Sequence, residues 1–169
     1  MKMKFISLIG ALIIQGLSGC ISNPMALGPV GPNPISPMVS SQKGYLQVFS
    51  AIVKSIPMAS DDPTTFNLHS SYDIYDESGK ALKYVPNHAS NMDESPDQAS
   101  LASGNYYIIA ESSCCGSVKV PVVIQTGKTT VVHLDSNAWQ PSNTPTNQLV
   151  FLPDGEVVGW SSSASKASR

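Results

Sequence analysis

The sequence predicts an all-β protein, an antiparallel β-sandwich of about seven strands. From Gly44 onward, short runs rich in Val, Ile, Tyr and Thr alternate between apolar and polar positions, with Gly, Pro, Asn and Asp between them. That alternation is typical of half-buried strands separated by turns. No sustained 3.6-residue apolar period follows the first 20 residues, so we expect no helix in the core.

The expected strands are residues 44–54, 66–75, 80–86, 99–102, 105–111, 117–125 and 128–134. Asp76-Glu77-Ser78-Gly79 is expected to turn the second strand into the third, and Thr126-Gly127 to join the last two. Leu68, Tyr72 and Ile74 are assigned to the inner face by their alternation, as are Val118, Val120, Val122 and Ile124. Pro121 has no N–H to donate, so it must lie at a sheet edge or a bulge.

The N-terminus has the layout of a secretory signal peptide: Lys2 and Lys4, an apolar run over residues 5–16, and small residues before Cys20. The run has twelve residues, whereas a membrane-spanning helix needs about 20. Leu17-Ser18-Gly19-Cys20 resembles the signal of bacterial lipoproteins. The resemblance implies cleavage before Cys20 and a covalent lipid on its thiol. The alternative is an ordinary cleaved signal in which Cys20 is incidental.

A lipidated Cys20 would tether the chain to a membrane of the cell envelope, because two or more acyl chains anchor a protein stably. Ile21, not an acidic residue, follows the cysteine. By the same resemblance, this favours the outer over the inner membrane in a bacterium that has both. Apart from the lipid, no cofactor is expected.

Four segments are expected. Residues 1–19 are the signal, 20–43 the lipidated cysteine and a Pro/Gly-rich tether, 44–135 the sandwich, and 136–169 a linker, a terminal hairpin and a frayed tail. The hairpin would pair residues 149–152 with 157–160 around Pro153-Asp154-Gly155. Fully extended, the tether would reach on the order of 70 Å. Simple disorder is the alternative for that segment.

Charge argues against a nucleic-acid partner. Two of the ten basic residues, Lys2 and Lys4, are removed with the signal. The remaining chain then has eight basic and twelve acidic residues, and its net charge is −4. No basic patch is present in the sequence, and nucleic-acid binding depends on one. The remaining 150 residues (169 less 19) suffice for one domain with a modest core.

Residues 66–135 resemble carboxypeptidase-regulatory-like and PEGA-type domains. The motif Leu101-Ala102-Ser103-Gly104-Asn105-Tyr106 is similar to their corner of leucine, two residues, glycine, one residue and tyrosine. The resemblance implies a transthyretin-like or immunoglobulin-like sandwich that serves as a non-catalytic accessory, spacer or binding module. We expect Tyr106 to pack its ring inside and to bond a backbone group with its hydroxyl.

Cys114 and Cys115 are adjacent in the turn between two strong strands. Outside the cytosol disulfides persist, and three states compete: a vicinal disulfide, two free thiols, or a bridge to another chain. A vicinal disulfide or an ordinary loop is favoured over a redox or metal site.

Other candidate sites have simpler explanations. His69 and His133 fall on the outward phase of their strands and are expected at the surface, and with His88 they lack the spacing of metal ligands. Turn chemistry explains the acidic clusters, so calcium is not expected. These clusters are Asp61-Asp62, Asp76-Glu77 and Asp93-Glu94 with Asp97. Ser163-Ala164-Ser165-Lys166 matches S-x-x-K, but its companion motifs are missing from the sequence. We assign no metal site and no catalytic residue.

Aromatic residues are the remaining candidates for binding. Tyr75, Tyr84, Tyr107, Trp139 and Trp160 could stack on sugars, although core packing is the usual role of such residues. Trp139 and Trp160 could fold back and seal the edge of the sandwich. A binding role predicts an exposed aromatic or apolar patch of roughly a few hundred Å².

The sequence thus predicts a non-enzymatic, lipid-anchored protein of the cell envelope with a structural or binding sandwich. Its partners would be the membrane and an envelope protein or glycan. The alternative is a surface carbohydrate- or protein-binding accessory protein. The third reading is an envelope hydrolase, for which His69, His133 and Asp73 are the only candidates.

Overall fold

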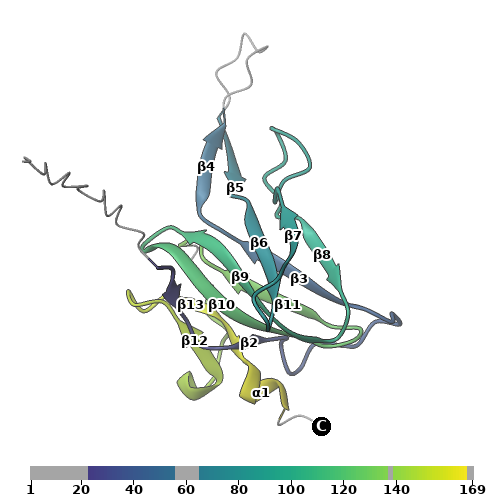
Figure 1. Cartoon of the computed structure of the whole chain (residues 1–169). Coiled ribbons are helices and arrows are strands. Elements are labelled where there is room, and N and C mark those ends of the chain that lie inside the picture. Colours follow the sequence, from purple (N-terminus) through teal and green to yellow (C-terminus); the bar gives the residue numbers. More distant parts are fainter. Residues whose placement is uncertain (1–22, 56–64, 137–138, 167–169) are drawn as a thin grey trace, which may run out of the picture.

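The computed structural model describes residues 23–55, 65–136 and 139–166. Two β-sheets face each other, and a two-stranded hairpin projects from them (Figure 1). The large sheet has the order β12 (Leu149–Phe151), β13 (Val157–Ser161), β2 (Val30–Gly31), β10 (Gly116–Ile124), β9 (Gly104–Ser112), β6 (Tyr72–Asp76) and β7 (Ala81–Val85). Strand β1 (Met25–Ala26) also pairs with β10. The predicted all-β sandwich is confirmed.

The small sheet has the order β11 (Thr129–His133), β3 (Gly44–Phe49) and β8 (Gln98–Leu101). Strands β4 (Ile52–Ser55) and β5 (Phe66–His69) pair only with each other among the described residues, and we call this hairpin the arm. A short 3₁₀ helix, η1 (Thr146–Gln148), precedes β12, and helix α1 (Ser162–Lys166) follows β13.

The core lies between the two sheets and follows the strict alternation of the strands. In β10 the side chains of Val118, Val120, Val122 and Ile124 are buried, as predicted. They meet Leu46 and Val48 of β3, Val132 of β11, and Ile108 and Ala110 of β9 in one apolar cluster. Leu68, Tyr72 and Ile74 are also buried, as predicted. This apolar layer between the sheets leaves the outward side chains of the large sheet available for other roles.

Two of the expected strands are each broken in the structure. Residues 44–54 divide into β3 and β4 at Ser50-Ala51, and residues 66–75 divide into β5 and β6 at Ser70-Ser71. At this corner the chain leaves the sandwich and enters the arm. Ser70 donates its N–H to the Ala51 carbonyl oxygen at 2.9 Å, and the Ser50 hydroxyl donates to the Ser70 carbonyl oxygen. A backbone hydrogen bond and the Ser50 side chain therefore satisfy backbone groups that the break releases.

Asn87 stabilises this corner through the hydrogen bonds of its buried side chain. Its side-chain amide donates to the Val48 carbonyl oxygen and to the Ser50 hydroxyl, both at 2.9 Å. Its side-chain oxygen accepts the N–H of Asp97 at 3.1 Å. Asn87 is fully buried and has a φ of 71°, a left-handed conformation that asparagine tolerates better than most residues.

Pairing is not antiparallel throughout. β3 and β11 are parallel, and β1 and β2 both run parallel to β10. Hairpin turns dictate antiparallel neighbours, as in the long β9–β10 hairpin. β3 and β11 instead lie far apart in the chain and meet only through tertiary packing.

The expected tether over residues 20–43 is wrong for its described part. β1 and β2 belong to the large sheet, and Val30 is completely buried in the core. Without this segment, that side of β10 would present unpaired N–H and C=O groups, which proteins seldom leave uncovered. Further along, the Val39 N–H donates to the Gly127 carbonyl oxygen at 2.9 Å. Much of the proline-rich segment is therefore part of the domain.

The prediction that Pro121 lies at a sheet edge or a bulge is wrong, because β10 is an interior strand and pairs with β9 in unbroken register. β1 pairs with Val118 and Lys119, and β2 pairs with Val122, so the break between β1 and β2 lies beside Pro121. A residue without an N–H is tolerated where the ladder is already interrupted.

The C-terminal segment is also more integrated than expected. The predicted hairpin is present as β12 and β13, but β13 pairs with β2 and extends the large sheet. Val150, Leu152 and Val158 join the core cluster. The expected frayed tail is wrong for residues 162–166, which form α1, where the Ser162 N–H donates to the Pro29 carbonyl oxygen at 2.9 Å.

Candidate functional site

Three of the predicted aromatic candidates share the outer face of the large sheet, and we call Tyr75, Tyr84 and Tyr107 the tyrosine face. Tyr75 and Tyr107 lie on neighbouring strands in direct register, and their rings are parallel with centroids 4.9 Å apart. Tyr84 on β7 is opposite Asp73 of β6 and is 60% exposed. These three residues point outward because their strand neighbours Ile74, Val85 and Ile108 fill the core.

A groove of about 440 Å³ lies beside the tyrosine face. It is lined by Pro29, Glu77, Asn105, Tyr106, Tyr107, Lys119, Pro121, Val122, Val123 and Ser162. Outward side chains of β9 and β10 meet residues from the β6–β7 turn, the β1–β2 connection and the start of α1. The volume is within the usual range for small-ligand sites, about 300–1,000 Å³. An apolar surface with a few polar groups is also typical of such sites.

Lys119 supplies the positive charge of the groove. Its ammonium nitrogen lies 3.7 Å from the centroid of the Tyr107 ring, within the range of a cation–π contact. Tyr107 is thus held between Tyr75 on one side and Lys119 on the other. The stack holds the ring and the ammonium in place, which leaves them pre-arranged for a ligand.

Glu77 and Asn105 form the polar wall. The Asn105 side-chain amide donates to a Glu77 carboxylate oxygen at 2.9 Å. Glu77 is positioned by the turn before it, where one oxygen of Asp76 accepts the N–H groups of Ser78 and Lys80 and the Ser78 hydroxyl. These hydrogen bonds, that of the Ser78 side chain foremost, lower the pKa of Asp76 below its usual value. The predicted turn chemistry of this acidic pair is confirmed.

Trp139 and Trp160 lie away from the tyrosine face. Trp160 on β13 is only 8% exposed, and its ring meets that of Trp139 edge to face with centroids 6.4 Å apart. Trp139 in turn stacks on His133 at 4.7 Å. Trp139 therefore packs back against the sandwich, whereas Trp160 is part of an interior strand of the large sheet, so the prediction that it folds back to seal an edge is wrong.

The expectation that His69 and His133 lie at the surface is wrong. His69 is 5% exposed, and its Nδ1 is 2.9 Å from the Ser50 carbonyl oxygen. His133 does point outward from the small sheet, but Phe49 and Trp139 cover its two ring faces. This burial is the main cause that lowers the pKa of His133, while the nearby Asp135 carboxylate acts in the opposite direction. Strand phase gave the correct side of the sheet for His133, but it could not show the aromatic cover.

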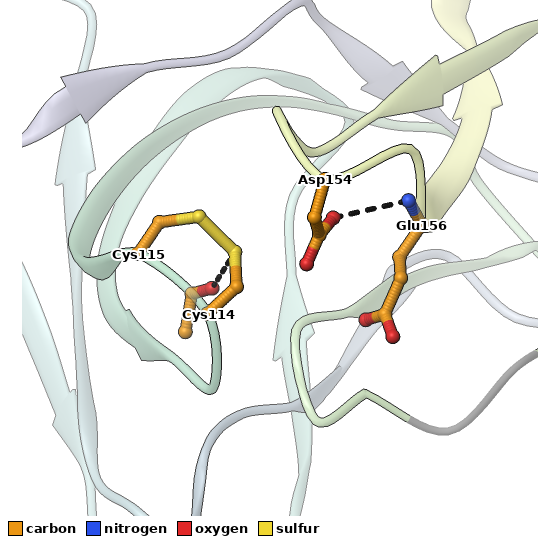
Figure 2. Close-up of a disulfide and its surroundings, with 5 residues drawn as sticks. Cys114, Cys115, Asp154 and Glu156 are labelled. Atoms are coloured by element: carbon orange, nitrogen blue, oxygen red, sulfur yellow. Dashed lines mark hydrogen bonds between the residues drawn. A yellow bond between two sulfur atoms is a disulfide. The ribbon is translucent and has the colours of Figure 1, made fainter.

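Cys114 and Cys115 are joined as a vicinal disulfide in the structure, with an S–S distance of 1.98 Å. The pair forms the tip of the β9–β10 hairpin, and the turn of the β12–β13 hairpin brings Asp154 beside it (Figure 2). Ligand atoms of the two cysteines and Asp154 lie within 4.8 Å of one another. Metal ions bind thiolates, so the three residues could hold a metal only after the disulfide is reduced. One Asp154 oxygen already accepts the Glu156 N–H at 3.1 Å.

Other candidate residues have ordinary roles or lie outside the described residues. Cys20 and the Asp61-Asp62 pair lie outside them. Asp93 accepts the Ser95 N–H at 3.0 Å, and Glu94 accepts the Asn67 N–H at 2.7 Å. His88 is half-buried in the loop after β7. The Ser163 hydroxyl lies 2.7 Å from that of Ser161.

Tyr106 fulfils its predicted role. Its ring packs against the core, and its hydroxyl donates to the Ala102 carbonyl oxygen at 3.1 Å. This contact is a tyrosine corner of the kind found in sandwich folds. The bond closes the Leu101–Tyr106 corner on which the family resemblance rests.

Sequence reasoning missed Lys119, Glu77 and Asn105 as groove residues. Alternation in 117–125 and 105–111 could have placed Lys119 and Asn105 on the outer face with Tyr107. It could not have shown that β9 lies between β10 and β6, nor that Pro29 and Ser162 close the groove.

Comparison with family models, with curated proteins and with solved structures found no match. The resemblance to carboxypeptidase-regulatory-like and PEGA-type domains therefore stays a prediction. None of the helices in the described part of the chain is both long and apolar enough to cross a membrane.

Proposed function

We propose that this chain is a non-enzymatic, lipid-anchored protein of the cell envelope, and that the groove beside its tyrosine face binds a glycan. The anchor rests on the lipoprotein-like motif ending at Cys20. The observation that carries the binding role is the groove itself, which combines tyrosine rings with one ammonium, one carboxylate and one amide. The outer membrane is the favoured location.

The chemistry of the groove suits a sugar. A pyranose ring has apolar C–H faces and a rim of hydroxyl groups, so it requires both apolar surface and paired donors and acceptors. Pro29, Pro121 and Val123 provide apolar surface. Glu77 accepts hydrogen bonds, Lys119 donates them and Asn105 can do both. The stacked Tyr75–Tyr107 pair is held rigidly, so ordering it costs little on binding.

A purely structural role is the second candidate. The large sheet contains the long β9–β10 hairpin and also includes β1, β2 and β13. Such a sandwich could act as a spacer between the membrane and other parts of the envelope. The exposed Tyr84 favours binding over this role, because exposed aromatic surface commonly marks an interaction site.

A glycan array probed with the purified chain tests the binding role. We expect selective binding to envelope-type saccharides, weakened at least about tenfold by Tyr107→Ala and by Lys119→Met, since a lost charged hydrogen bond costs about 1.5–3 kcal/mol. Lys83→Met is the matched control, because Lys83 lies on β7 and does not line the groove. A folded protein that binds no saccharide on the array would leave the spacer role in its place.

Palmitate labelling of the producing bacterium tests the anchor. The natural chain should incorporate label and sediment with membranes, and Cys20→Ala should do neither. Labelling that persists in Cys20→Ala would show that the anchor assignment is wrong.

A further inference from the structure

We propose that the end of the sandwich at which β9 turns into β10 faces the lipid surface, and that the β4–β5 arm lies against the lipid headgroups there. This inference rests on the proposed lipid at Cys20. It adds an orientation and a second membrane contact, neither of which follows from the anchor motif alone.

The first step is the place where the chain enters the fold. β1 runs parallel to β10, with Met25 opposite Val118 and Ala26 opposite Lys119. Asn23 and Pro24, which precede Met25, therefore lie beside the start of β10, next to the Cys114–Cys115 tip. In Figure 1 the first described residues, in dark purple, begin at this end of β9 and β10.

The second step is the length of the connection. Cys20 precedes Met25 by five residues (25 less 20), and a chain spans at most about 3.6 Å per residue. Whatever its conformation, the connection cannot exceed about 18 Å. The nine residues of β9 extend over roughly 30 Å. A lipid on Cys20 would therefore hold the β9–β10 tip near the bilayer and favour keeping the opposite end, with the Gly127 turn, away from it.

The third step places the arm at the same end. The Ala51 N–H, just before β4, donates to the Glu111 carbonyl oxygen at 2.9 Å, and Glu111 is close to the β9–β10 tip. From there β4 and β5 leave the two sheets and project outward, as Figure 1 shows for the blue hairpin. The anchor and the arm thus start from one end of the molecule.

The fourth step is the surface of the arm. Ile52 is 38% exposed and Val53 is 53% exposed. Neighbouring residues of a strand point to opposite faces, so the arm exposes apolar side chains on both faces. A lone two-stranded hairpin is marginally stable in water. Contact with the headgroup region would remove this apolar surface from water, and the exposed Lys54 beside it suits lipid phosphates.

Lipid is the occupant that the geometry favours over a second copy of the chain. The anchor holds the arm within reach of the bilayer at all times, so contact with lipid occurs at a high effective concentration. A second copy would have to be recruited from solution or by diffusion in the membrane.

The test uses an environment-sensitive fluorophore on the full lipidated chain in vesicles of phosphatidylcholine with brominated acyl chains. The dye is attached through Val53→Cys or, as matched control, through Val39→Cys. Val39 is 56% exposed, and its N–H bonds the Gly127 turn at the opposite end. We expect bromolipid to quench the dye at position 53 at least about twofold more than the dye at position 39, with a blue-shifted emission for position 53 alone.

Two kinds of contrary result are distinguishable. Equal quenching at the two positions, in protein that floats with the vesicles, overturns the membrane-facing arm and leaves the anchor intact. A natural chain that carries no lipid on Cys20 overturns the anchor and this inference together. Labelling of the chain without an added cysteine is the blank, because Cys114 and Cys115 are bonded to each other.

Discussion

Single polar atoms decide local stability in this core. The Tyr72 ring is 2% exposed, and its hydroxyl has no hydrogen-bond partner among the described residues. Burial, and secondarily the Asp97 carboxylate, raise the pKa of Tyr72 far above its usual value. The Tyr106 hydroxyl, in contrast, bonds the Ala102 carbonyl oxygen. The two tyrosines should therefore respond in opposite ways to loss of the hydroxyl.

We predict that Tyr72→Phe leaves the free energy of unfolding unchanged or raises it by up to about 1 kcal/mol, because it removes an unpaired buried hydroxyl. Tyr106→Phe should lower it by about 1 kcal/mol through loss of a hydrogen bond. Urea unfolding of both variants gives the two values. A clear loss of stability in Tyr72→Phe would contradict the unpaired state.

The disulfide between Cys114 and Cys115 predicts a change in the mass of the protein on reduction. The purified protein should resist alkylation at Cys114 and Cys115 before reduction. Reduction should add two hydrogen atoms, and alkylation should then replace both thiol hydrogens with alkyl groups. Mass spectrometry with and without reductant measures both states. Equal masses in the two samples, together with free alkylation before reduction, would exclude the disulfide seen in the structure.

His133 makes stability depend on pH. Its folded-state pKa is lowered from the ordinary value of 6.5, chiefly by burial. The unfolded chain therefore binds this proton more readily, so the stabilising contribution is present above about pH 6.5 and is lost as the pH falls through the folded-state pKa. Besides Asp135, the groups that surround the ring are His69, Phe49 and Trp139.

We expect the free energy of unfolding to fall between pH 7.5 and pH 5, and to fall less steeply in His133→Phe, which keeps an aromatic ring in the stack. Urea titrations at the two pH values measure the slope. An unchanged slope in the variant would assign the pH dependence to another group.

At the scale of elements, turns and corners determine where each strand begins and ends. Gly127 has a φ of 70°, and a Cβ at this position would strike the Val39 carbonyl oxygen. Gly155, in the β12–β13 turn, has a φ of 91° and open space around it. Both positions need a left-handed backbone. Only Gly127 is also in close contact with the N-terminal segment, through the backbone of Val39.

We predict that Gly155→Ala costs roughly 1–2 kcal/mol of unfolding free energy from the backbone conformation alone. Gly127→Ala should cost more, because the added methyl group also displaces the chain at Val39. The difference between the two variants, measured by urea unfolding, reports the packing of the N-terminal segment. Equal losses of unfolding free energy in the two variants would indicate that Val39 does not pack against the Gly127 turn.

At the scale of the whole molecule, the two ends of the chain complete the sandwich. β2 contributes the buried Val30, and β13 contributes the buried Val158. The Gly159 Cα lies so close to the Val131 carbonyl oxygen that a Cβ would be 2.8 Å from it. β13 therefore also packs against the small sheet.

A fragment of residues 44–135 should consequently fail to fold stably, although it contains all seven predicted strands. A fragment of residues 23–166 should unfold cooperatively. Circular dichroism and limited proteolysis of the two fragments test this expectation. A cooperative transition in the shorter fragment would restore the tether as a separate segment.

Strand periodicity predicted the sandwich and the inward residues of β6 and β10, because alternation is a local property of the chain. The Tyr106 corner was predicted from the resemblance of residues 101–106 to a family motif, which is also local. Their aromatic side chains alone made the three tyrosines candidates for binding. Strand periodicity could not separate them from Trp139 and Trp160, because ring burial depends on which strands become neighbours. The breaks at Ser50-Ala51 and Ser70-Ser71 escaped it for the same reason.

The sequence by itself determined the all-β class, most strand positions and the lipoprotein-like motif at Cys20, since each follows from neighbouring residues. Only the tertiary structure decided that the proline-rich segment joins the large sheet, that Lys119 and Glu77 meet at one groove, and that the start of β1 and the arm lie at one end. These features arise from contacts between distant segments. Such contacts are set by the competition of sheet edges for partners, and local pattern does not encode its outcome.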